Sequence, residues 1–301
     1  MNIKKVIRRI NWIIKSIPNI LLALVFETKK HPWKYIYEYM TLSANKRYTR
    51  TDYYIKKYFN ITKSGSDYLL ERGDFKIAIP ENFFLKNNVM LGFLTVYFDI
   101  IYTNQVKFPI PFIVIEGNYE YGEVRVKPGD YIIDAGANLG VFSTYYAPKV
   151  GSEGKIFAFE PMPEIYKIVL NQIKYTQFKN IVAVEEALGD KIYKTNFKYS
   201  EENIEGSSEN GPGESVEVKV NTIDSYVKEN NIKKIDFIKM DIEGAERYAL
   251  VGATETIKKY KPRLSICVYH LPDDPIVIKN IILNIRPDYK YKMNDWKIYA
   301  Y

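Results

Sequence analysis

The sequence predicts an α/β fold, with a parallel sheet covered by helices on both faces and a C-terminal antiparallel hairpin that brings the sheet to seven strands. Three observations predict it. From Val124 onward, short apolar stretches alternate with helical ones, which favours strand-helix-strand units. A glycine-containing loop, Asp134–Gly140, follows the first of these strands. Two strands end the chain on either side of Asn294-Asp295, a pair that is typical of a hairpin turn.

The composition places the chain among globular proteins. Hydrophobic residues make up 47% of its 301 residues and charged residues 26%. Cys267 is the single cysteine, which excludes an internal disulfide and a cysteine-based zinc cluster. The two histidines, His31 and His270, are too few for a His-rich metal site. We therefore expect a reducing, cytoplasmic setting.

The positive charge of the chain belongs to its beginning. Residues 1–70 hold 14 Lys/Arg and four acidic residues, a net charge of +10, whereas the remainder carries −3. The apolar run Ile17–Phe26 is too short to span a bilayer, and Glu27-Thr28-Lys29-Lys30 follows it in place of a signal-peptide cleavage site. Two interpretations stay open for residues 1–30: an amphipathic helix at the inner membrane surface, or a core helix of a helical cap.

The chain before the α/β pattern divides into two parts. We expect residues 1–66 to be a basic, helical segment and residues 67–123 to be a β-rich extension, with short strands such as Phe75–Ile79 and Phe112–Glu116. Residues 124–301 then form the α/β domain.

Within the α/β domain the elements follow one another in a regular order. The loop Ser200–Gly213 is rich in Gly and Ser and is expected to be a flexible surface loop. Helices are expected from Val141, from Pro163, over Glu246–Tyr260, and after a cap at Asp273 or Asp274. The expected strands are Tyr131–Asp134, Lys155–Glu160, Ile181–Glu185, Ile235–Met240, Leu264–His270, Tyr289–Met293 and Trp296–Tyr301.

The loop after the first parallel strand is the predicted cofactor loop. A ligand binds beyond the carboxyl end of such a strand. Glycine lets the backbone approach a ligand closely, and Asn is one of the few other residues that tolerate a positive φ. The acid at Asp134 suits the ammonium group of a methionine moiety but repels a pyrophosphate, and the NAD fingerprint is absent. The loop therefore predicts S-adenosylmethionine binding by Asp134, Gly136, Ala137, Asn138 and Gly140.

Two later strands offer further cofactor contacts. Glu160 ends the second strand, where a carboxylate can accept hydrogen bonds from ribose hydroxyls. Ala187 and Leu188 follow the third strand, where an adenine ring would lie. A capped loop without ligand contact is an equally good interpretation of this second position.

Four segments together resemble the FkbM family of methyltransferases: Val126–Asp130, Asp134–Gly140, Phe159-Glu160-Pro161 and Ile238–Glu246. The resemblance covers about residues 116–293, and the N-terminal third matches no family pattern. It implies a class I methyltransferase fold of the Rossmann-like type, S-adenosylmethionine as methyl donor, and O-methylation of a sugar, glycolipid, polysaccharide or polyketide.

The candidate catalytic residues follow the fourth and fifth strands. O-methyl transfer requires that the acceptor hydroxyl be oriented and lose its proton. Asp241 and Glu243 can assist directly, or a divalent cation can do so with Asp241 as a ligand. Lys239 can hold Asp241 ionised, and His270 is an alternative base or a bystander. The sequence alone assigns no metal ligands.

We expect an enzyme that methylates a hydroxyl of a carbohydrate or a lipid-linked glycan. A nucleic-acid methyltransferase is the alternative, because the N-terminus is basic and the chain has 27 Tyr. The chain lacks the Asn/Asp-Pro-Pro-Tyr and catalytic Pro-Cys motifs that such enzymes use, so nucleic acid is the weaker interpretation. A non-catalytic module that binds the cofactor is a third hypothesis.

Overall fold

The computed structural model describes residue 55 and residues 59–73, 75–84, 118–176, 178–200, 203–208 and 214–301. Within these residues, no helix has both the length and the apolar character needed to cross a bilayer. The segment 1–54, with its apolar run, and the strand expected at 112–116 lie outside the described residues.

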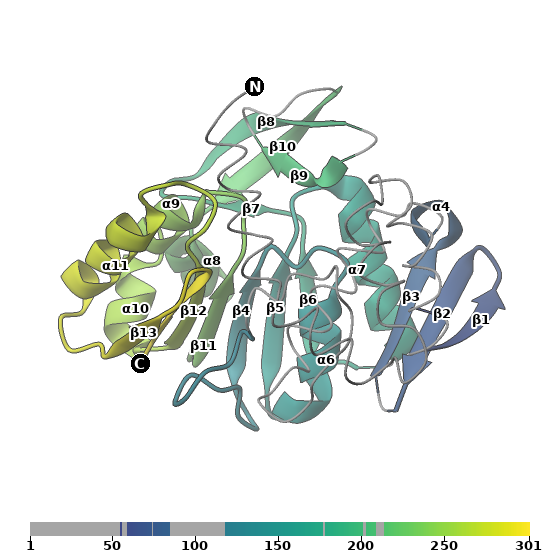
Figure 1. Cartoon of the computed structure of the whole chain (residues 1–301), viewed down its shortest axis with the longest axis horizontal. Coiled ribbons are helices and arrows are strands. Elements are labelled where there is room, and N and C mark those ends of the chain that lie inside the picture. Colours follow the sequence, from purple (N-terminus) through teal and green to yellow (C-terminus); the bar gives the residue numbers. More distant parts are fainter. Residues whose placement is uncertain are drawn as a thin grey trace, which may run out of the picture.

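A seven-stranded sheet forms the centre of the molecule (Figure 1). Its order is β13-β14-β12-β11-β4-β5-β6. Strand β14 runs antiparallel to its two neighbours, β13 and β12. The five strands from β12 to β6 in this order pair in parallel. The predicted α/β class and the terminal antiparallel hairpin are confirmed. The strands span β4 Tyr131–Ala135, β5 Lys155–Phe159, β6 Ile181–Val184, β11 Phe237–Met240, β12 Arg263–Cys267, β13 Tyr291–Met293 and β14 Lys297–Ala300.

Helices cover both faces of this sheet because neighbouring strand residues point to opposite sides. Ile132 belongs to the core on one face, with residues of α6 (Val141–Val150) and α7 (Pro163–Thr176). Ile133 belongs to the core on the other face, with α8 (Ile223–Glu229), α9 (Glu246–Val251), α10 (Thr254–Tyr260) and α11 (Asp274–Ile285). Both cores are apolar, so the inner parallel strands are buried on two sides, as expected for a parallel sheet, whereas β13 at the edge is exposed.

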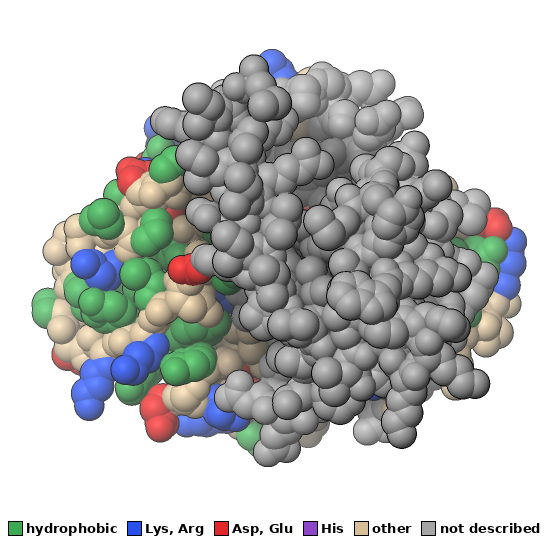
Figure 2. Space-filling model, viewed as in Figure 1, with side chains coloured by type: hydrophobic (Ala, Val, Ile, Leu, Met, Phe, Trp, Pro, Cys, Tyr) green, Lys and Arg blue, Asp and Glu red, His purple; other side chains and the backbone are tan. Residues whose placement is uncertain are grey.

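Some hydrophobic side chains remain at the surface of the half that contains α8–α11 and β13. Figure 2 shows them among charged side chains on this part of the molecule. Ile276 and Tyr248 are the most exposed, at 63% and 54%. Scattered apolar residues of this kind are normal on a protein surface.

A three-stranded antiparallel sheet packs at one end of the molecule, beside α7 (Figure 1). It consists of β1 (Asn60–Ser64), β2 (Asp67–Arg72) and β3 (Phe75–Pro80), and α4 (Glu81–Phe84) follows it. The side chain of Gln172 joins α7 to β3, since it accepts from Ala78 N and donates to Ala78 O. The strand over Phe75–Ile79 is confirmed. Because β1 begins at Asn60, the last residues of the segment 1–66 are not helical as expected.

A second correction concerns residues 200–213, which were expected to form a flexible loop. Asn203–Ser208 is the strand β9, the edge of a four-stranded sheet of order β7-β10-β8-β9. The other strands are β7 (Ala187–Leu188), β8 (Tyr193–Ser200) and β10 (Glu214–Asn221). Backbone pairing with β8 forms β9 although its side chains are polar, so the polar composition misled the prediction.

The helix expected over Glu246–Tyr260 is interrupted after Val251. A Cβ at Gly252 would overlap the carbonyl oxygen of Gly189, so the chain turns there in close contact with another loop. The carboxylate of Asp224, in α8, then accepts from Glu255 N and Thr256 N at 2.9 and 2.7 Å. This tertiary cap starts α10 as a separate helix.

Candidate active site

The predicted cofactor loop has the backbone that its residues suggested. Gly136, Asn138 and Gly140 have φ values of 76°, 49° and 76°. Gly140 precedes α6, and a Cβ there would press against the side chain of Gln172 at 3.2 Å, so close packing at the helix start is confirmed. Gly136 differs from expectation. A Cβ there would overlap the carbonyl oxygen of Asp241, so its close neighbour is the backbone after β11.

Hydrogen bonds attach this loop to the end of β5. The amides of Gly136 and Ala137 donate to Phe159 O at 3.1 and 2.9 Å. The amide of Asn138 donates to Glu160 Oε2 at 3.0 Å. The structure therefore joins the two predicted cofactor-binding segments into a single unit at the carboxyl edge of the sheet.

Glu160 is buried, and each of its carboxylate oxygens has a backbone partner. Oε1 accepts from Met162 N at 3.0 Å, while Oε2 accepts from Asn138 N. Burial raises the pKa of Glu160 to about 7, and the two backbone hydrogen bonds offset this effect only in part. The carboxyl group therefore changes its charge near neutral pH.

Asp134 is fully buried and is paired with Lys239 rather than open to a ligand. Its Oδ1 lies 3.1 Å from Lys239 Nζ, and its Oδ2 accepts from Ser143 Oγ at 2.7 Å. The two residues are adjacent because Asp134 of β4 is in register with Lys239 of β11. Asp134 thus has the ammonium group of Lys239 as a partner within the protein, and its expected contact with a methionine moiety stays a prediction. An influence of Asp134 on cofactor binding stays a prediction and would act through the loop.

Lys239 also supports the loop directly. It donates to Gly136 O at 2.6 Å and to Ala135 O at 3.2 Å. Burial alone would lower the pKa of Lys239, but Asp134 and Asp241 raise it above its ordinary value, so the side chain stays charged. Its contacts indicate that Lys239 positions the loop.

Asp241 is held by two tyrosines. Tyr119 OH donates to Oδ2 at 2.7 Å and Tyr269 OH donates to Oδ1 at 3.0 Å. Burial would raise the pKa of Asp241, but Lys239, Lys297 and His270, together with the Tyr119 hydrogen bond, lower it to about 2. The expectation that Lys239 favours the ionised form is confirmed. A carboxylate with so low a pKa accepts a proton poorly at neutral pH, so Asp241 suits orientation or cation binding better than general-base catalysis.

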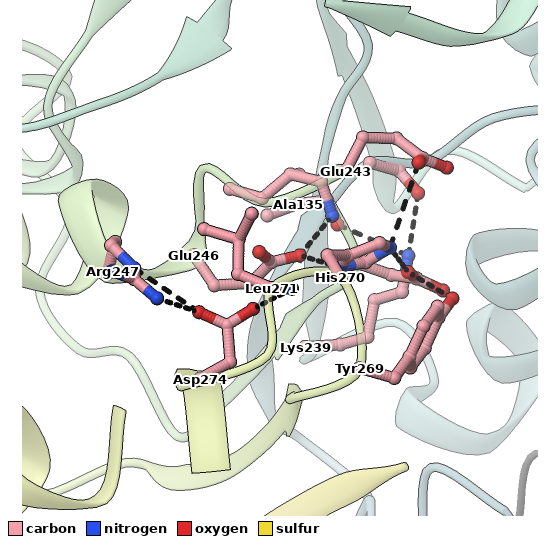
Figure 3. A network of polar contacts seen from close by, with 12 residues as sticks. Ala135, Lys239, Glu243, Glu246, Arg247, Tyr269, His270, Leu271 and Asp274 are labelled. Atoms are coloured by element: carbon pink, nitrogen blue, oxygen red, sulfur yellow. Dashed lines mark hydrogen bonds and ion pairs between the residues drawn. The ribbon is translucent and has the colours of Figure 1, made fainter. Parts of the chain in front are cut away.

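His270 lies between carboxylates at the end of β12 (Figure 3). Its Nδ1 is 3.0 Å from Glu246 Oε1, and its Nε2 is 3.5 Å from Asp241 Oδ1 and 3.8 Å from Glu243 Oε2. Burial would lower the pKa of His270, but Glu246, Asp241 and Glu243 raise it to about 9. Without a bound cation the imidazole therefore keeps its proton at neutral pH, which disfavours the general-base role considered from the sequence.

The two residues expected to contact adenine lie in a strand of the four-stranded sheet rather than in a loop. Ala187 and Leu188 form β7, which pairs in parallel with β10. Both side chains are buried, and Leu188 belongs to the same apolar cluster as Phe159. Their contact with adenine stays a prediction.

Several residues of the site were not predicted from the sequence. Tyr119 precedes the α/β domain by five residues, and no motif marks it. Lys297 is fully buried and lowers the pKa of Asp241 from the last strand. Glu246 was assigned only to a helix start, whereas it accepts from Ile242 N at 2.8 Å and faces His270. Glu246 is the first residue of α9, and no local pattern links it to His270, because their contact joins two distant segments.

The cofactor loop and Glu160 lie at the carboxyl edge of the sheet, as do the neighbouring side chains of Asp241, Glu246 and His270. The model of the FkbM methyltransferase domain matches residues 134–293, more than half of the chain. The chain belongs to the FkbM methyltransferase family. The match begins at Asp134 and includes Glu160, Asp241 and His270, whereas Tyr119 and Lys297 lie outside it.

Two curated relatives match only part of the chain. Methyltransferase sdnD of Sordaria araneosa is 25% identical over 169 residues, which are 45% of this chain and 64% of the relative. Methyltransferase 1 of Beauveria bassiana is 27% identical over 153 residues, 43% of this chain and 61% of the relative. The chain thus spans somewhat over three fifths of the length of these relatives.

A solved structure with the same family name is also similar. The crystal structure of methyltransferase FkbM from Methylobacillus flagellatus is 25% identical, with a TM-score of 0.48. The likeness covers 59% of this chain and 44% of that chain.

Proposed function

We propose that this protein transfers a methyl group from S-adenosylmethionine to a hydroxyl of a sugar, glycolipid or related acceptor. The hydrogen bond from Asn138 N to Glu160 Oε2 carries the proposal, because it unites the cofactor loop and the acid that would bind a ribose. Membership of a methyltransferase family supports the reaction class.

The cofactor part of the proposal rests on the free hydrogen-bonding capacity of Glu160. An ionised carboxylate offers about four acceptor positions, and two are used by Met162 N and Asn138 N. The others are available to the two ribose hydroxyls. Since both oxygens are held by backbone amides, the carboxylate is oriented before a ligand arrives.

We expect the affinity for S-adenosylhomocysteine to fall as the pH drops below about 7, the pKa of Glu160. Protonation occupies one oxygen and removes the charge that strengthens the ribose hydrogen bonds, so the apparent Kd should rise about tenfold one pH unit below the pKa. Calorimetric titrations from pH 5.5 to 8.5 measure this, with each pH given about equal ionic strength. Glu160→Gln should bind more weakly with no such pH dependence, and a flat profile for the wild type would contradict the assignment.

The acceptor part of the proposal rests on Asp241. When bound, S-adenosylmethionine supplies a methyl group on a positively charged sulfur. The hydroxyl oxygen of the acceptor forms the new bond to this carbon as the sulfur–carbon bond breaks, and the hydroxyl proton is released. Asp241, kept ionised and held by Tyr119 and Tyr269, is suited to orient that hydroxyl.

Labelled methyl transfer tests the proposal. The full chain is incubated with methyl-labelled S-adenosylmethionine and separate glycan, lipid and RNA fractions from one cell extract. We expect label in the glycan or lipid-linked glycan fraction, released by glycan hydrolysis and stable to RNase. Label confined to RNA would overturn the acceptor class. Binding of S-adenosylhomocysteine without labelling of any fraction would favour a non-catalytic module.

We also propose that residues 1–30 bring the enzyme to an anionic membrane, where lipid-linked acceptors reside. The support is the net charge of +10 in residues 1–70 beside the apolar run Ile17–Phe26. Basic residues near acidic lipid contribute about 1 kcal/mol each. In flotation assays, binding should increase with the anionic lipid content and decrease with salt. Equal flotation by a chain without residues 1–30 would show that this segment is not the anchor.

A further inference from the structure

Three side chains of the candidate active site come close together from different elements. Two of them, Glu246 and His270, are labelled in Figure 3. Asp241 follows β11, His270 follows β12, and Glu246 begins α9. One oxygen or nitrogen atom from each lies within 4.8 Å of the other two. Two carboxylates and one imidazole form a donor set that transition-metal ions accept.

Two buried side chains of this cluster, Glu246 and His270, each have an atom without a hydrogen-bond partner. Glu246 is fully buried, and its Oε2 has none, while Oε1 accepts from Ile242 N. The side chain of His270 is 8% exposed; its Nδ1 forms an ion pair with Glu246 Oε1 at 3.0 Å, whereas its Nε2 has no hydrogen-bond partner. Buried polar atoms are nearly always paired in native proteins, so such a group calls for a bound ion or water.

The distances between the ligand atoms fit a shared ion. The separation of 3.5 Å between His270 Nε2 and Asp241 Oδ1 is too long for a good hydrogen bond. Two atoms that each bind one ion at about 2.1 Å lie about 3.0–3.5 Å apart when the angle between them is about 90–110°. Glu246 Oε1 lies 3.0 Å from the other ring nitrogen, Nδ1, and a carboxylate oxygen of Glu246 is within 4.8 Å of a ligand atom from each of the other two residues. An ion that binds His270 displaces the proton of the ring, because a metal-bound imidazole is neutral.

We propose that Asp241, Glu246 and His270 bind one divalent transition-metal ion, of which Mn²⁺ is the representative, in the acceptor part of the active site. This rests on the proposed function and deepens it. The half-exposed carboxylate of Glu243, 3.8 Å from His270 Nε2, adds negative charge on the open side of the cluster. An acceptor hydroxyl that binds the ion loses its proton more readily, which is the chemistry that O-methylation needs.

The surroundings hold the three ligands in place. Tyr119 and Tyr269 donate to Asp241 at 2.7 and 3.0 Å. The segment after His270 is fixed by Asp274, whose Oδ2 accepts from Leu271 N at 2.7 Å and whose Oδ1 pairs with Arg247 (Figure 3). Such outer contacts orient metal ligands and commonly affect metal affinity by about 10- to 100-fold.

Metal titration of the full chain tests the site. After treatment with a chelator and its removal, Mn²⁺ is added and the free ion is followed by electron paramagnetic resonance. We expect saturable binding of one ion per chain. Glu246→Gln and His270→Gln should each weaken it at least about tenfold. Glu217→Gln is the matched control, since this glutamate lies in an exposed pair with Lys194, and it should bind as the wild type does.

Two outcomes would overturn the metal site: no saturable binding, or unchanged affinity in both variants. Circular dichroism establishes that each variant is folded. If Glu246→Gln fails to fold because Glu246 is fully buried, His270→Gln alone decides the test. Methyl transfer at the full rate in excess chelator would overturn the metal site and leave the proposed function intact. Conversely, Mn²⁺ binding by a chain that does not bind S-adenosylhomocysteine would overturn the proposed function and not the site.

Discussion

Replacing Asp241 with Asn should lower the turnover of methyl transfer by about 10²- to 10⁴-fold. The amide keeps the size of the side chain and removes its charge. Neither the acceptor hydroxyl nor a cation is then held by an anion at the end of β11. Affinity for S-adenosylhomocysteine should change little, because Glu160 and the cofactor loop hold their own hydrogen bonds apart from this side chain.

Turnover at saturating S-adenosylmethionine and calorimetry with S-adenosylhomocysteine measure the two quantities separately. Tyr119→Phe and Tyr269→Phe provide graded comparisons, since each removes one hydrogen bond to Asp241 and leaves its charge. Each should lower turnover less than Asp241→Asn does. Near-normal turnover in Asp241→Asn would exclude Asp241 from the mechanism.

Replacing Lys239 with Met should lower the free energy of unfolding by about 3–5 kcal/mol. Met approximates the length of the Lys stem and removes the ammonium group. Asp134, which is completely buried, then loses the cation 3.1 Å from its Oδ1. The carbonyl oxygens of Gly136 and Ala135 lose a donor as well. Urea denaturation followed by circular dichroism measures the change.

Two controls distinguish the effect of an unpaired buried charge on stability from the effect of losing an ion pair. The double variant Asp134→Asn with Lys239→Met should recover part of the stability, because no unpaired charge remains inside. Lys63→Met breaks an exposed pair with Glu81 and should leave the free energy of unfolding nearly unchanged. A loss below about 1 kcal/mol in Lys239→Met would mean that the ion pair does not stabilise the fold.

The order and type of elements in the central domain could be predicted because they depend on local pattern. The core strands are short apolar runs bounded by turn residues, such as Tyr131–Ala135 after Pro128-Gly129. The sequence analysis did not predict the strand β10, although Val216, Val218 and Val220 alternate with polar residues there, which is the pattern of a strand. The polar strand β9 had no such pattern.

The order of strands and helices in the sequence was enough to predict which segments meet at the carboxyl edge of the sheet, because parallel strands place their carboxyl ends together. It therefore indicated Asp134, Glu160, Asp241 and His270 as neighbours of one site. The partners of each carboxylate depend on tertiary contacts. Asp134 pairs with Lys239 because β4 and β11 are in register, and Glu246 meets His270 because the start of α9 lies beside the loop after β12. These pairings follow from the relative positions of distant segments, so no local spacing could reveal them.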